Sequence, residues 1–438
     1  MKKQKFTITI VNWAGVNTGD DAIFVALMDE IQKIMKKIST DIEFFILTDN
    51  DIRIKNIYSK EYAIKDTLRI FEFYKLRNIL KVIKILQKSD VIIYGGGDLI
   101  NGNFQSISFL GLAKLMGIPV FLIGIGATHI NSKFLSFITT VVLNHVDIIT
   151  VRDRDSKYNL KKLGVIKPKI YLTSDIAFLL NSANNKNKLI YNYITNINSK
   201  KIIIGINLRA YDPMYSYYSI WDENHIIKEF SKICDYLVDK YNAEIIFLPM
   251  VLKNRTLPYY ENILSDDDIY MKIFKLVKYR GNIKIIKEDY NPKEFIEFLK
   301  QLDLVIAMRL HTLLLASLAG VPIIAISYAP KVSSFMHDLN LLDYTIPIFE
   351  LRKRKLIDMI QKALNNKSSF TFPPFKQIEN AKLNTKILEK KLSQIKYKHF
   401  KRRTLAPLLG IPIIIFLNYI FLIISKIITL KGKKRWFK

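Results

Sequence analysis

The sequence predicts an α/β fold built from two doubly wound, Rossmann-like domains. Short runs of Ile, Val and Leu alternate with helical patterns up to about residue 180, and the alternation restarts at about residue 201. Several of these runs are followed by glycine. Nearly every residue within them is apolar, which is typical of parallel strands that helices cover on both faces.

The first domain is predicted over residues 1–180. It begins with a strand at Phe6–Trp13 and a helix from about Thr18 to Lys37. Further strands are expected at Glu43–Thr48, Val91–Tyr94, Pro119–Ile125, Ile148–Val151 and Lys169–Leu172, with helices between them. A sheet of this kind binds ligands beyond the carboxyl ends of its strands.

Residues 181–200 are rich in Asn and Lys and have no periodicity, which predicts a linker. A second domain follows over residues 201–370, and we expect the two domains to face each other across a cleft. Its predicted strands are Ile202–Leu208, Glu244–Pro249, Ile283–Ile286, Leu304–Met308 and Ile323–Ser327. Its predicted helices lie near Ile226–Tyr241, Lys293–Gln301, His311–Ala319 and Leu356–Leu364.

Residues 371–400 are predicted as a helix or linker, and residues 401–438 as an apolar membrane anchor with basic flanks. Thr404–Ser425 contains 22 residues without a charge, which at ~1.5 Å per residue just reaches across a ~30 Å hydrocarbon core. Pro407 and Pro412 interrupt its first half, Asn418 lies in its middle, and both flanks are basic. These features favour a re-entrant or in-plane anchor. A full span and a buried core helix are the alternatives.

The net charge of +28 predicts an anionic partner: nucleic acid, anionic lipid or a phosphorylated metabolite. The last 43 residues hold 11 Lys and Arg and no Asp or Glu, so the remaining chain carries +17. A general bias toward lysine is the alternative explanation for this body charge. The single Cys234 excludes a disulfide scaffold and a cysteine-based metal site. The N-terminus does not form a convincing signal peptide, so we expect a cytoplasmic protein attached peripherally or re-entrantly to the membrane.

The first candidate site is the turn Asn17-Thr18-Gly19-Asp20, between the first strand and the first helix. Its glycine permits tight turning, and Thr18 or Asp20 is expected to cap the helix. We take Asp20 as a candidate substrate-binding residue, the alternative being a plain capped turn. The dinucleotide fingerprint G-x-G-x-x-G is absent, which argues against NAD.

The second candidate site is Gly95-Gly96-Gly97, directly after a predicted strand. Three glycines at a strand end allow backbone amides to face an anion and a ligand to come close. A tight turn is the alternative. Gly124-Ile125-Gly126 ends the next strand and is expected to line the same crevice.

The third candidate site is Arg309-Leu310-His311, at a predicted strand-to-helix turn. Arginine suits carboxylate and phosphate, and histidine moves protons near neutral pH. From Leu304 to His337 there is no Asp or Glu, whereas Lys331 is present, so the segment is expected to bind a compact polyanion. Arg209 and Arg152 follow other strands and are expected to add positive charge. No nucleophile elbow and no metal-ligand cluster is evident, and we expect neither a metal nor an organic cofactor.

Together these segments resemble the polysaccharide pyruvyl transferase family. The resemblance covers most of the chain from Phe6 to about Leu342. It depends on Asn17–Asp20, Gly95–Gly97, Ile149–Asp153, Gly205–Arg209, Met308–His311, Ala319–Pro322 and Ser327–Val332, in that order.

The resemblance implies a two-domain fold like that of B-type glycosyltransferases. It also implies transfer of pyruvate from phosphoenolpyruvate to a sugar as a cyclic ketal, with release of phosphate. The family's functional residues fall on Arg209 and on Arg309, Leu310 and His311. Because the reaction must move protons, we expect His311 to be the general acid/base. The partners expected are phosphoenolpyruvate, a saccharide acceptor either free or linked to a lipid, and the membrane surface through residues 401–438.

Two other functions remain open at the level of the sequence. A nucleotide-sugar glycosyltransferase shares the architecture, but it usually places a carboxylate for the ribose where Leu304–His337 has none. A non-catalytic membrane scaffold for glycan assembly predicts that Arg309 and His311 are dispensable. Nucleic-acid binding does not explain why basic charge concentrates around an apolar tail, and we expect no nucleic-acid partner.

Overall fold

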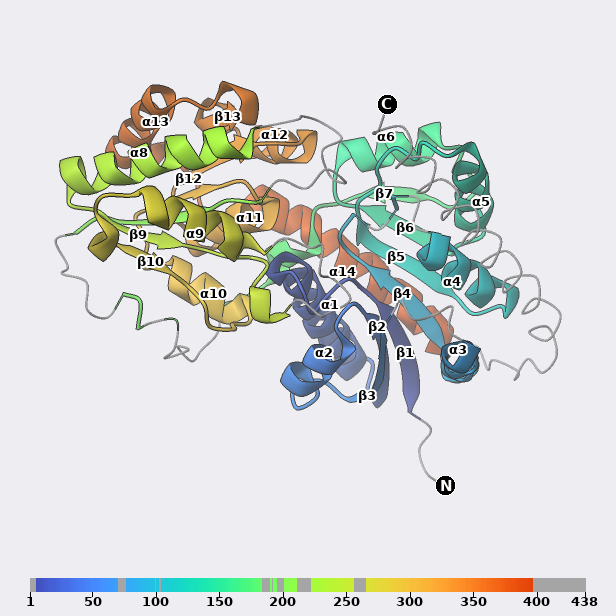
Figure 1. The fold of residues 1–438 in the computed structure, drawn as a ribbon. Coiled ribbons are helices and arrows are strands. Elements are labelled where there is room, and N and C mark those ends of the chain that lie inside the picture. The colour runs from blue at the N-terminus through green and yellow to red at the C-terminus, as the bar shows by residue number, and fades with distance from the viewer. Residues whose placement is uncertain are drawn as a thin grey trace, which may run out of the picture. The chain divides into compact units, whose positions relative to one another are not determined.

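The computed structural model describes residues 5–69, 76–98, 100–101, 104–182, 190, 192–194, 201–210, 222–255 and 265–396. The chain divides into two compact units. Unit 1 comprises Met1–Trp13, Leu27–Ile176 and Ala381–Lys438, and unit 2 comprises Ala14–Ala26 and Ala177–Asn380. Both units have the predicted Rossmann-like architecture of a parallel sheet with helices (Figure 1).

The described part of unit 1 contains a seven-stranded parallel sheet in the order β3-β2-β1-β4-β5-β6-β7. Its strands are β1 (Phe6–Val11), β2 (Ile42–Thr48), β3 (Ile64–Arg69), β4 (Val91–Gly95), β5 (Val120–Ile125), β6 (Ile148–Val151) and β7 (Ile170–Leu172). The order reverses between β1 and β4, which is where doubly wound sheets bind ligands. Every residue of β4, β5 and β6 is buried, as their unbroken apolar sequences predict.

Helices connect these strands: α1 (Thr18–Lys37), α2 (Asp51–Tyr58), α3 (Leu76–Lys88), α4 (Phe104–Leu115), α5 (Lys133–Leu143) and α6 (Arg154–Lys162). The bounds predicted for the first helix are confirmed. Strand β3 was not predicted, because its sequence Ile-Lys-Asp-Thr-Leu-Arg is mostly polar. It lies at one edge of the sheet, where a strand has only one neighbour to pair with and is less buried.

The described part of unit 2 contains a six-stranded parallel sheet in the order β10-β9-β8-β11-β12-β13. Its strands are β8 (Ile203–Asn207), β9 (Glu244–Phe247), β10 (Ile283–Ile285), β11 (Leu304–Ala307), β12 (Ile323–Ser327) and β13 (Thr345–Pro347). Its helices are α8 (Glu223–Tyr241), α9 (Asp266–Leu276), α10 (Pro292–Leu299), α11 (Leu310–Ala319), α12 (Pro330–Asp338) and α13 (Lys353–Asn365). The reversal of strand order here falls between β8 and β11. Strand β13 was not predicted, because its sequence Thr-Ile-Pro contains a single isoleucine and a proline and so shows no apolar run.

The division into units differs from the predicted domains in one N-terminal segment. Ala14–Ala26 was expected to belong to the first domain, but it belongs to unit 2. The Thr18 amide donates to the Met250 carbonyl (2.9 Å), and Asn17 forms an antiparallel bridge with Val251. These backbone bonds pair the turn with the chain that follows β9.

The C-terminal helix α14 (Phe375–Lys396) begins in unit 2, and from Ala381 onward it belongs to unit 1. Its fully buried Asn384 donates to the Ser174 carbonyl (2.9 Å) and accepts from the Thr173 hydroxyl (2.9 Å). Leu388 and Leu392 are buried as well. Among the described helices, none is both long and apolar enough to cross a membrane. The predicted anchor over residues 401–438 and most of the predicted linker lie outside the described residues.

Candidate functional site

The carboxyl ends of β8 and β11 in unit 2 bring together two of the predicted segments. The Asn207 side chain ends β8, donates to the Leu248 carbonyl (2.8 Å), and accepts from the Arg309 backbone amide (3.0 Å). Arg309 is the residue before the first turn of α11. A buried asparagine of one strand therefore sets where the Arg309-Leu310-His311 triplet starts, with Leu310 half-buried in the first turn.

The Arg309 guanidinium forms a bidentate ion pair with Asp266, at the start of α9. Its Nε lies 3.0 Å from Oδ2 and its Nη2 lies 2.5 Å from Oδ1. Asp266 is fully buried and also accepts from the Met250 and Val251 amides (2.9 and 3.1 Å). Burial alone would lower the pKa of Arg309, but the Asp266 carboxylate raises it above its ordinary value. Arg309 is therefore a fixed cation whose charge is partly balanced from within the protein.

This ion pair brings a carboxylate to a segment that has none of its own. Leu304–His337 contains no acid, but the fold supplies one from Asp266, some 40 residues earlier along the chain. The Asp266 carboxylate is not available to a ligand, because its oxygens already accept hydrogen bonds from two backbone amides and from Arg309. A buried carboxylate of this kind orients an arginine rather than binding a ribose hydroxyl.

Tyr328, directly after β12, lies among three cations. The Arg209 Nη1 donates to the Tyr328 hydroxyl (3.3 Å), and the Arg209 guanidinium lies over the Tyr328 ring, 5.4 Å from its centroid. Burial would raise the pKa of this phenol, but Lys331, Arg209 and Arg309 together lower it to about 8. Three predicted cations thus act on one phenol, and each of them favours its ionised form.

His311 packs against the glycine of the Asn17–Asp20 turn. A Cβ added to Gly19 would lie 2.5 Å from Nδ1 of His311 and 2.7 Å from its Cγ. No real side chain fits at such a distance, so glycine is required here for the imidazole to approach the start of α1. Two segments that are 292 positions apart in the sequence therefore form one site in unit 2.

The turn itself is held by Asn17. Its side-chain oxygen accepts from the Gly19 amide (3.0 Å), and its side-chain nitrogen donates to Asp20 (2.9 Å). Thr18 or Asp20 was expected to cap α1, but Asn17 does so, and Thr18 instead accepts from the Arg255 Nη1 (2.6 Å). Arg255 is 1% exposed and also donates to Asp289 and to the Tyr290 carbonyl. This buried arginine anchors the turn, and with it the glycine that supports His311.

Arg152, in unit 1, has a different environment. It follows β6 and forms ion pairs with three carboxylates: Asp98, Asp153 (3.3 Å) and Asp175 (3.4 Å). Burial would lower the pKa of Arg152, but these three carboxylates raise it above its ordinary value. The negative charge of these three carboxylates therefore exceeds the positive charge expected from Arg152. The carboxyl end of this sheet presents carboxylate oxygens, with Asp98 one-third exposed.

The glycines of unit 1 serve chiefly to bring chain segments close together. A Cβ on Gly95 would collide with Leu27 of α1 at 2.2 Å, and one on Gly126 would lie 2.6 Å from the Asp98 carboxylate. The Gly96 amide donates to the Ile123 carbonyl (2.9 Å), and the Gly97 carbonyl accepts from the Gly126 amide (2.6 Å). Gly96 and Gly97 have φ values of 66° and 77°, which favour glycine. The Gly96 amide is thus committed to the fold, and the run positions Asp98 beside Arg152.

The structure therefore groups the predicted residues in two places. Unit 2 brings together Arg209, Arg309, Leu310, His311, Lys331 and the turn that contains Asp20. Unit 1 brings together Arg152 and Gly95–Gly97. Two residues were missed as site residues, Tyr328 and Asp266. Tyr328 lies three positions before Lys331, between β12 and α12, so the sequence already indicated that it is close to a predicted cation. Nothing in the local sequence marks Asp266.

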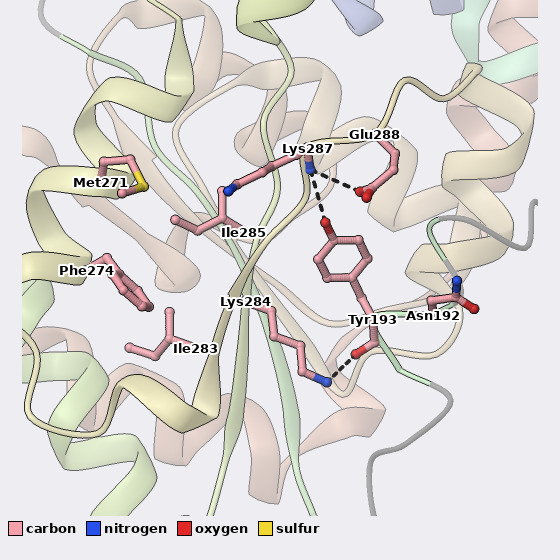
Figure 2. Close-up of a pocket in the computed structure, with 9 residues that line it drawn as sticks. All are labelled: Asn192, Tyr193, Met271, Phe274, Ile283, Lys284, Ile285, Lys287 and Glu288. Atoms are coloured by element: carbon pink, nitrogen blue, oxygen red, sulfur yellow. Dashed lines mark hydrogen bonds between the residues drawn. The ribbon is translucent and has the colours of Figure 1, made fainter.

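A separate pocket of about 470 Å³ lies at the edge of the unit 2 sheet, along β10 (Figure 2). Lys284 Nζ donates to the Tyr193 carbonyl (2.7 Å), and the Lys287 amide lies 3.3 Å from the Tyr193 hydroxyl. No predicted site residue lines this pocket. Its lining residues are Asn192, Tyr193, Met271, Phe274, Ile283, Lys284, Ile285, Lys287 and Glu288. Within the described residues, no group of three or more His, Cys, Asp or Glu side chains is placed to hold a metal ion.

Comparison with solved structures supports the architecture. The UDP-GlcNAc 2-epimerase of Methanocaldococcus jannaschii is 16% identical, with a TM-score of 0.60 over 89% of this chain and 99% of that one. The UDP-GlcNAc 2-epimerase of Neisseria meningitidis, solved with bound UDP-GlcNAc, is 14% identical, with a TM-score of 0.60 over 89% and 99%. At these identities the likeness concerns the fold alone. It is a fold of two Rossmann-like domains, like that of B-type glycosyltransferases.

Sequence comparison is more specific. The amylovoran biosynthesis protein AmsJ of Erwinia amylovora is 20% identical over 286 residues, which cover 64% of this chain and 67% of that protein. A family model described as polysaccharide pyruvyl transferase matches residues 17–330. That span contains the Asn17–Asp20 turn, the glycine run, Arg209 and the Arg309-Leu310-His311 triplet. The chain belongs to the polysaccharide pyruvyl transferase family.

Proposed function

We propose that this protein transfers pyruvate from phosphoenolpyruvate to a sugar of a cell-envelope polysaccharide or lipid-linked glycan, as a cyclic ketal, and releases phosphate. The family membership supports polysaccharide pyruvylation in general. The observation that carries the choice of donor is the set of cations around Tyr328 in unit 2. Phosphoenolpyruvate bears a carboxylate and a phosphate within a few ångströms, and such a compact polyanion requires several cations at once.

Arg209 and Lys331 are the cations we assign to the donor. Arg209 is half-buried and oriented by the Tyr328 ring, so its planar fork is preorganised for a carboxylate or phosphate. Arg309 adds charge, but its bidentate pair with Asp266 also holds the start of α11 in place. We assign Arg309 mainly the task of positioning Leu310 and His311.

His311 is the residue we assign to proton transfer. In the proposed reaction the methylene carbon of the donor gains a proton, and one sugar hydroxyl attacks the neighbouring carbon and loses its proton. Phosphate then leaves, a second hydroxyl closes the ketal, and its proton is lost to the medium. His311 lies against the turn at Gly19, which restricts the positions that the imidazole can take.

Unit 1 offers chemistry suited to the acceptor. Asp98 and Asp153 are 33% and 25% exposed and are oriented by the buried Arg152. Carboxylate oxygens accept hydrogen bonds from sugar hydroxyls and repel an anionic donor. We therefore assign the saccharide to the carboxyl end of the unit 1 sheet and the donor to that of unit 2.

Calorimetric titration tests the donor. Wild-type protein is expected to bind phosphoenolpyruvate, and Arg209→Ala to lose most of that heat. Arg209→Ala is the sharper variant than Arg309→Ala, because Arg309 also neutralises the buried Asp266. Lys253→Ala removes an exposed lysine of unit 2 from the segment that follows β9. This variant is the matched control and should bind phosphoenolpyruvate as the wild type does.

The same titration is run with a panel of nucleotide sugars. Binding of a nucleotide sugar without a response to phosphoenolpyruvate would contradict the proposal and support glycosyl transfer instead. Phosphate release from phosphoenolpyruvate that depends on added glycan, followed by phosphorus NMR, then tests the reaction itself.

We further propose that residues 401–438 attach the enzyme to the cytoplasmic face of the membrane, where a lipid-linked acceptor is presented. The apolar stretch Thr404–Ser425 and its basic flanks motivate this proposal. Removal of residues 397–438 should lower turnover of a lipid-linked acceptor in membranes and leave turnover of a water-soluble oligosaccharide unchanged. Equal turnover of the lipid-linked acceptor by both forms would contradict it.

A further inference from the structure

Helix α5 of unit 1 is apolar on the side that faces solvent. Phe134, Phe137 and Val141 are spaced three and four positions apart, so they lie on one face of the helix. They are 49%, 68% and 45% exposed. The opposite face, with Leu135, Ile138, Val142 and Leu143, packs on the core of unit 1. An exposed apolar stripe on the side of a helix away from the core normally marks a surface that binds something.

The loop that follows α6 places another exposed apolar side chain next to α5. The Thr140 hydroxyl donates to the Leu163 carbonyl (2.7 Å), and the Asn144 side chain donates to the Gly164 carbonyl (3.0 Å). Asn144 also accepts from the Ile166 and Lys167 amides, both at 2.9 Å. These bonds hold Ile166, which is 81% exposed, beside the end of α5. We name Phe134, Phe137, Val141 and Ile166 together the α5 face.

The chain around the α5 face is basic. Between Ser156 and Ser174 there are five lysines and no Asp or Glu. Four of the lysines, Lys161, Lys162, Lys167 and Lys169, are exposed, and Lys133 begins α5 on the same unit. The exposed Asp147 is paired with Lys114 (2.7 Å). Tyr158, 63% exposed on α6, lies under Lys162.

The combination of exposed aromatic and aliphatic side chains with lysines indicates what kind of partner binds the α5 face. A second copy of this chain would bring the two lysine-rich loops together, which like-charge repulsion opposes. An anionic bilayer satisfies both features, because its headgroup phosphates attract the lysines and its acyl boundary accepts phenylalanine and isoleucine. Unit 1 is also the unit from which the chain continues, after α14, into the apolar residues 401–438.

We infer that the α5 face is a membrane-docking surface, which inserts Phe134, Phe137 and Ile166 into the interface of an anionic bilayer while the neighbouring lysines bind headgroup phosphates. The inference concerns unit 1 and depends neither on the donor nor on the reaction. It adds a folded contact to whatever residues 401–438 contribute, and it gives unit 1 a defined side toward the lipid.

A fluorescent probe on the full-length chain tests the inference locally. The natural Cys234 is fully buried and its pKa is raised by burial, so an introduced exposed cysteine is labelled selectively. Phe137→Cys carries an environment-sensitive nitrobenzoxadiazole label. Phe349→Cys, at a 66% exposed phenylalanine of unit 2, is the matched control. Vesicles of mixed phosphatidylglycerol and phosphatidylcholine should shift the emission at position 137 to the blue and raise it several-fold, without a change at position 349.

Further arms decide between the outcomes. Vesicles of phosphatidylcholine alone, or added salt, should weaken the response at position 137, as should Lys161→Glu combined with Lys167→Glu. No response at position 137, or an equal response at both positions, would overturn the inference. A blue shift at position 137 that grows with protein concentration in the absence of vesicles would overturn it too, since it would identify a second copy as the occupant.

Discussion

The two units share the strand order of a doubly wound sheet, and they differ in the charge that they place at its carboxyl end. In unit 2, the carboxyl ends of the central strands present Arg209 and Lys331 around a phenol whose pKa is lowered. In unit 1, the carboxyl end of the sheet presents one arginine, Arg152 after β6, enclosed by three carboxylates. A doubly wound sheet decides where a ligand binds, and the side chains at the strand ends decide its charge.

This difference supports the proposal that the two units bind different substrates. The cationic end suits the polyanionic donor that we propose, and the acidic end suits the hydroxyl groups of a saccharide acceptor. The Asn17–Asp20 turn shows that the units are not independent in sequence, because a segment near the N-terminus completes the site of unit 2. Changes at the two ends should therefore have separable effects, the largest on catalysis and the smallest on acceptor recognition.

The largest effect is expected from Gly19→Ala. The added methyl would lie 2.5 Å from Nδ1 of His311 and must displace the imidazole. A displacement of about 1 Å in a catalytic group lowers kcat by ~100-fold, whereas donor affinity should change little. Steady-state kinetics measure both quantities. Gly281→Ala, where nothing lies within 4 Å, is the control and should keep full activity.

Arg209→Ala should weaken phosphoenolpyruvate binding by about 10- to 100-fold, the equivalent of one hydrogen bond to a charged group. Affinity for the saccharide should not change, because Arg209 belongs to unit 2. Calorimetry with each substrate separately measures the two effects. Arg209→Lys should recover only part of the loss, since it restores the charge without the planar fork over Tyr328. An equal loss for both substrates would erase the distinction between the two ends.

Donor affinity should also fall as the pH rises through about 8. Below this pH Tyr328 is a neutral phenol, and above it the phenolate places a negative charge beside Arg209 and Lys331. A bound anion favours the neutral form, so binding takes up a proton, and affinity should fall by up to about tenfold per pH unit above 8. Tyr328→Phe should remove this inflection in a titration series. A wild-type affinity that is flat between pH 7 and 9 would contradict the arrangement.

The smallest effect is expected from Asp98→Asn in unit 1. The substitution keeps the shape but exchanges a charged acceptor for a neutral one, which should raise the KM for the saccharide by about fivefold, or about 1 kcal/mol. The Kd for phosphoenolpyruvate should stay as it is. Asp268→Asn, at a half-buried aspartate on α9 of unit 2, is the control for removing one negative charge. A change in donor affinity with Asp98→Asn would show that the carboxylates of unit 1 serve the donor.

Much of the fold could be predicted from the sequence, because buried parallel strands consist of unbroken runs of apolar residues. All five strands predicted for unit 2 are confirmed, as is α1 at both of its ends. The two strands that were missed, β3 and β13, lie at the edges of their sheets. β3 is mostly polar and β13 has the sequence Thr-Ile-Pro, so neither shows an unbroken apolar run.

The candidate site was predictable in part. Residues that directly follow a strand, such as Arg209 and Arg309, can be located from the strand pattern, since parallel strands end at the same edge of a sheet. The residues that contact them in the folded protein cannot be located in this way. Asp266 and Gly19 lie far from Arg309 and His311 in the sequence, and no local pattern connects them.

The sequence by itself determined the two α/β architectures, the strand ends at which chemistry can occur, and the family to which the chain belongs. These are properties of local periodicity and of ordered motifs. Only the tertiary structure decided the charge of each site: it paired Arg309 with Asp266, surrounded Arg152 with carboxylates, and placed Tyr328 among cations. Electrostatic interaction depends on distance in space and on burial, and neither can be read along the chain.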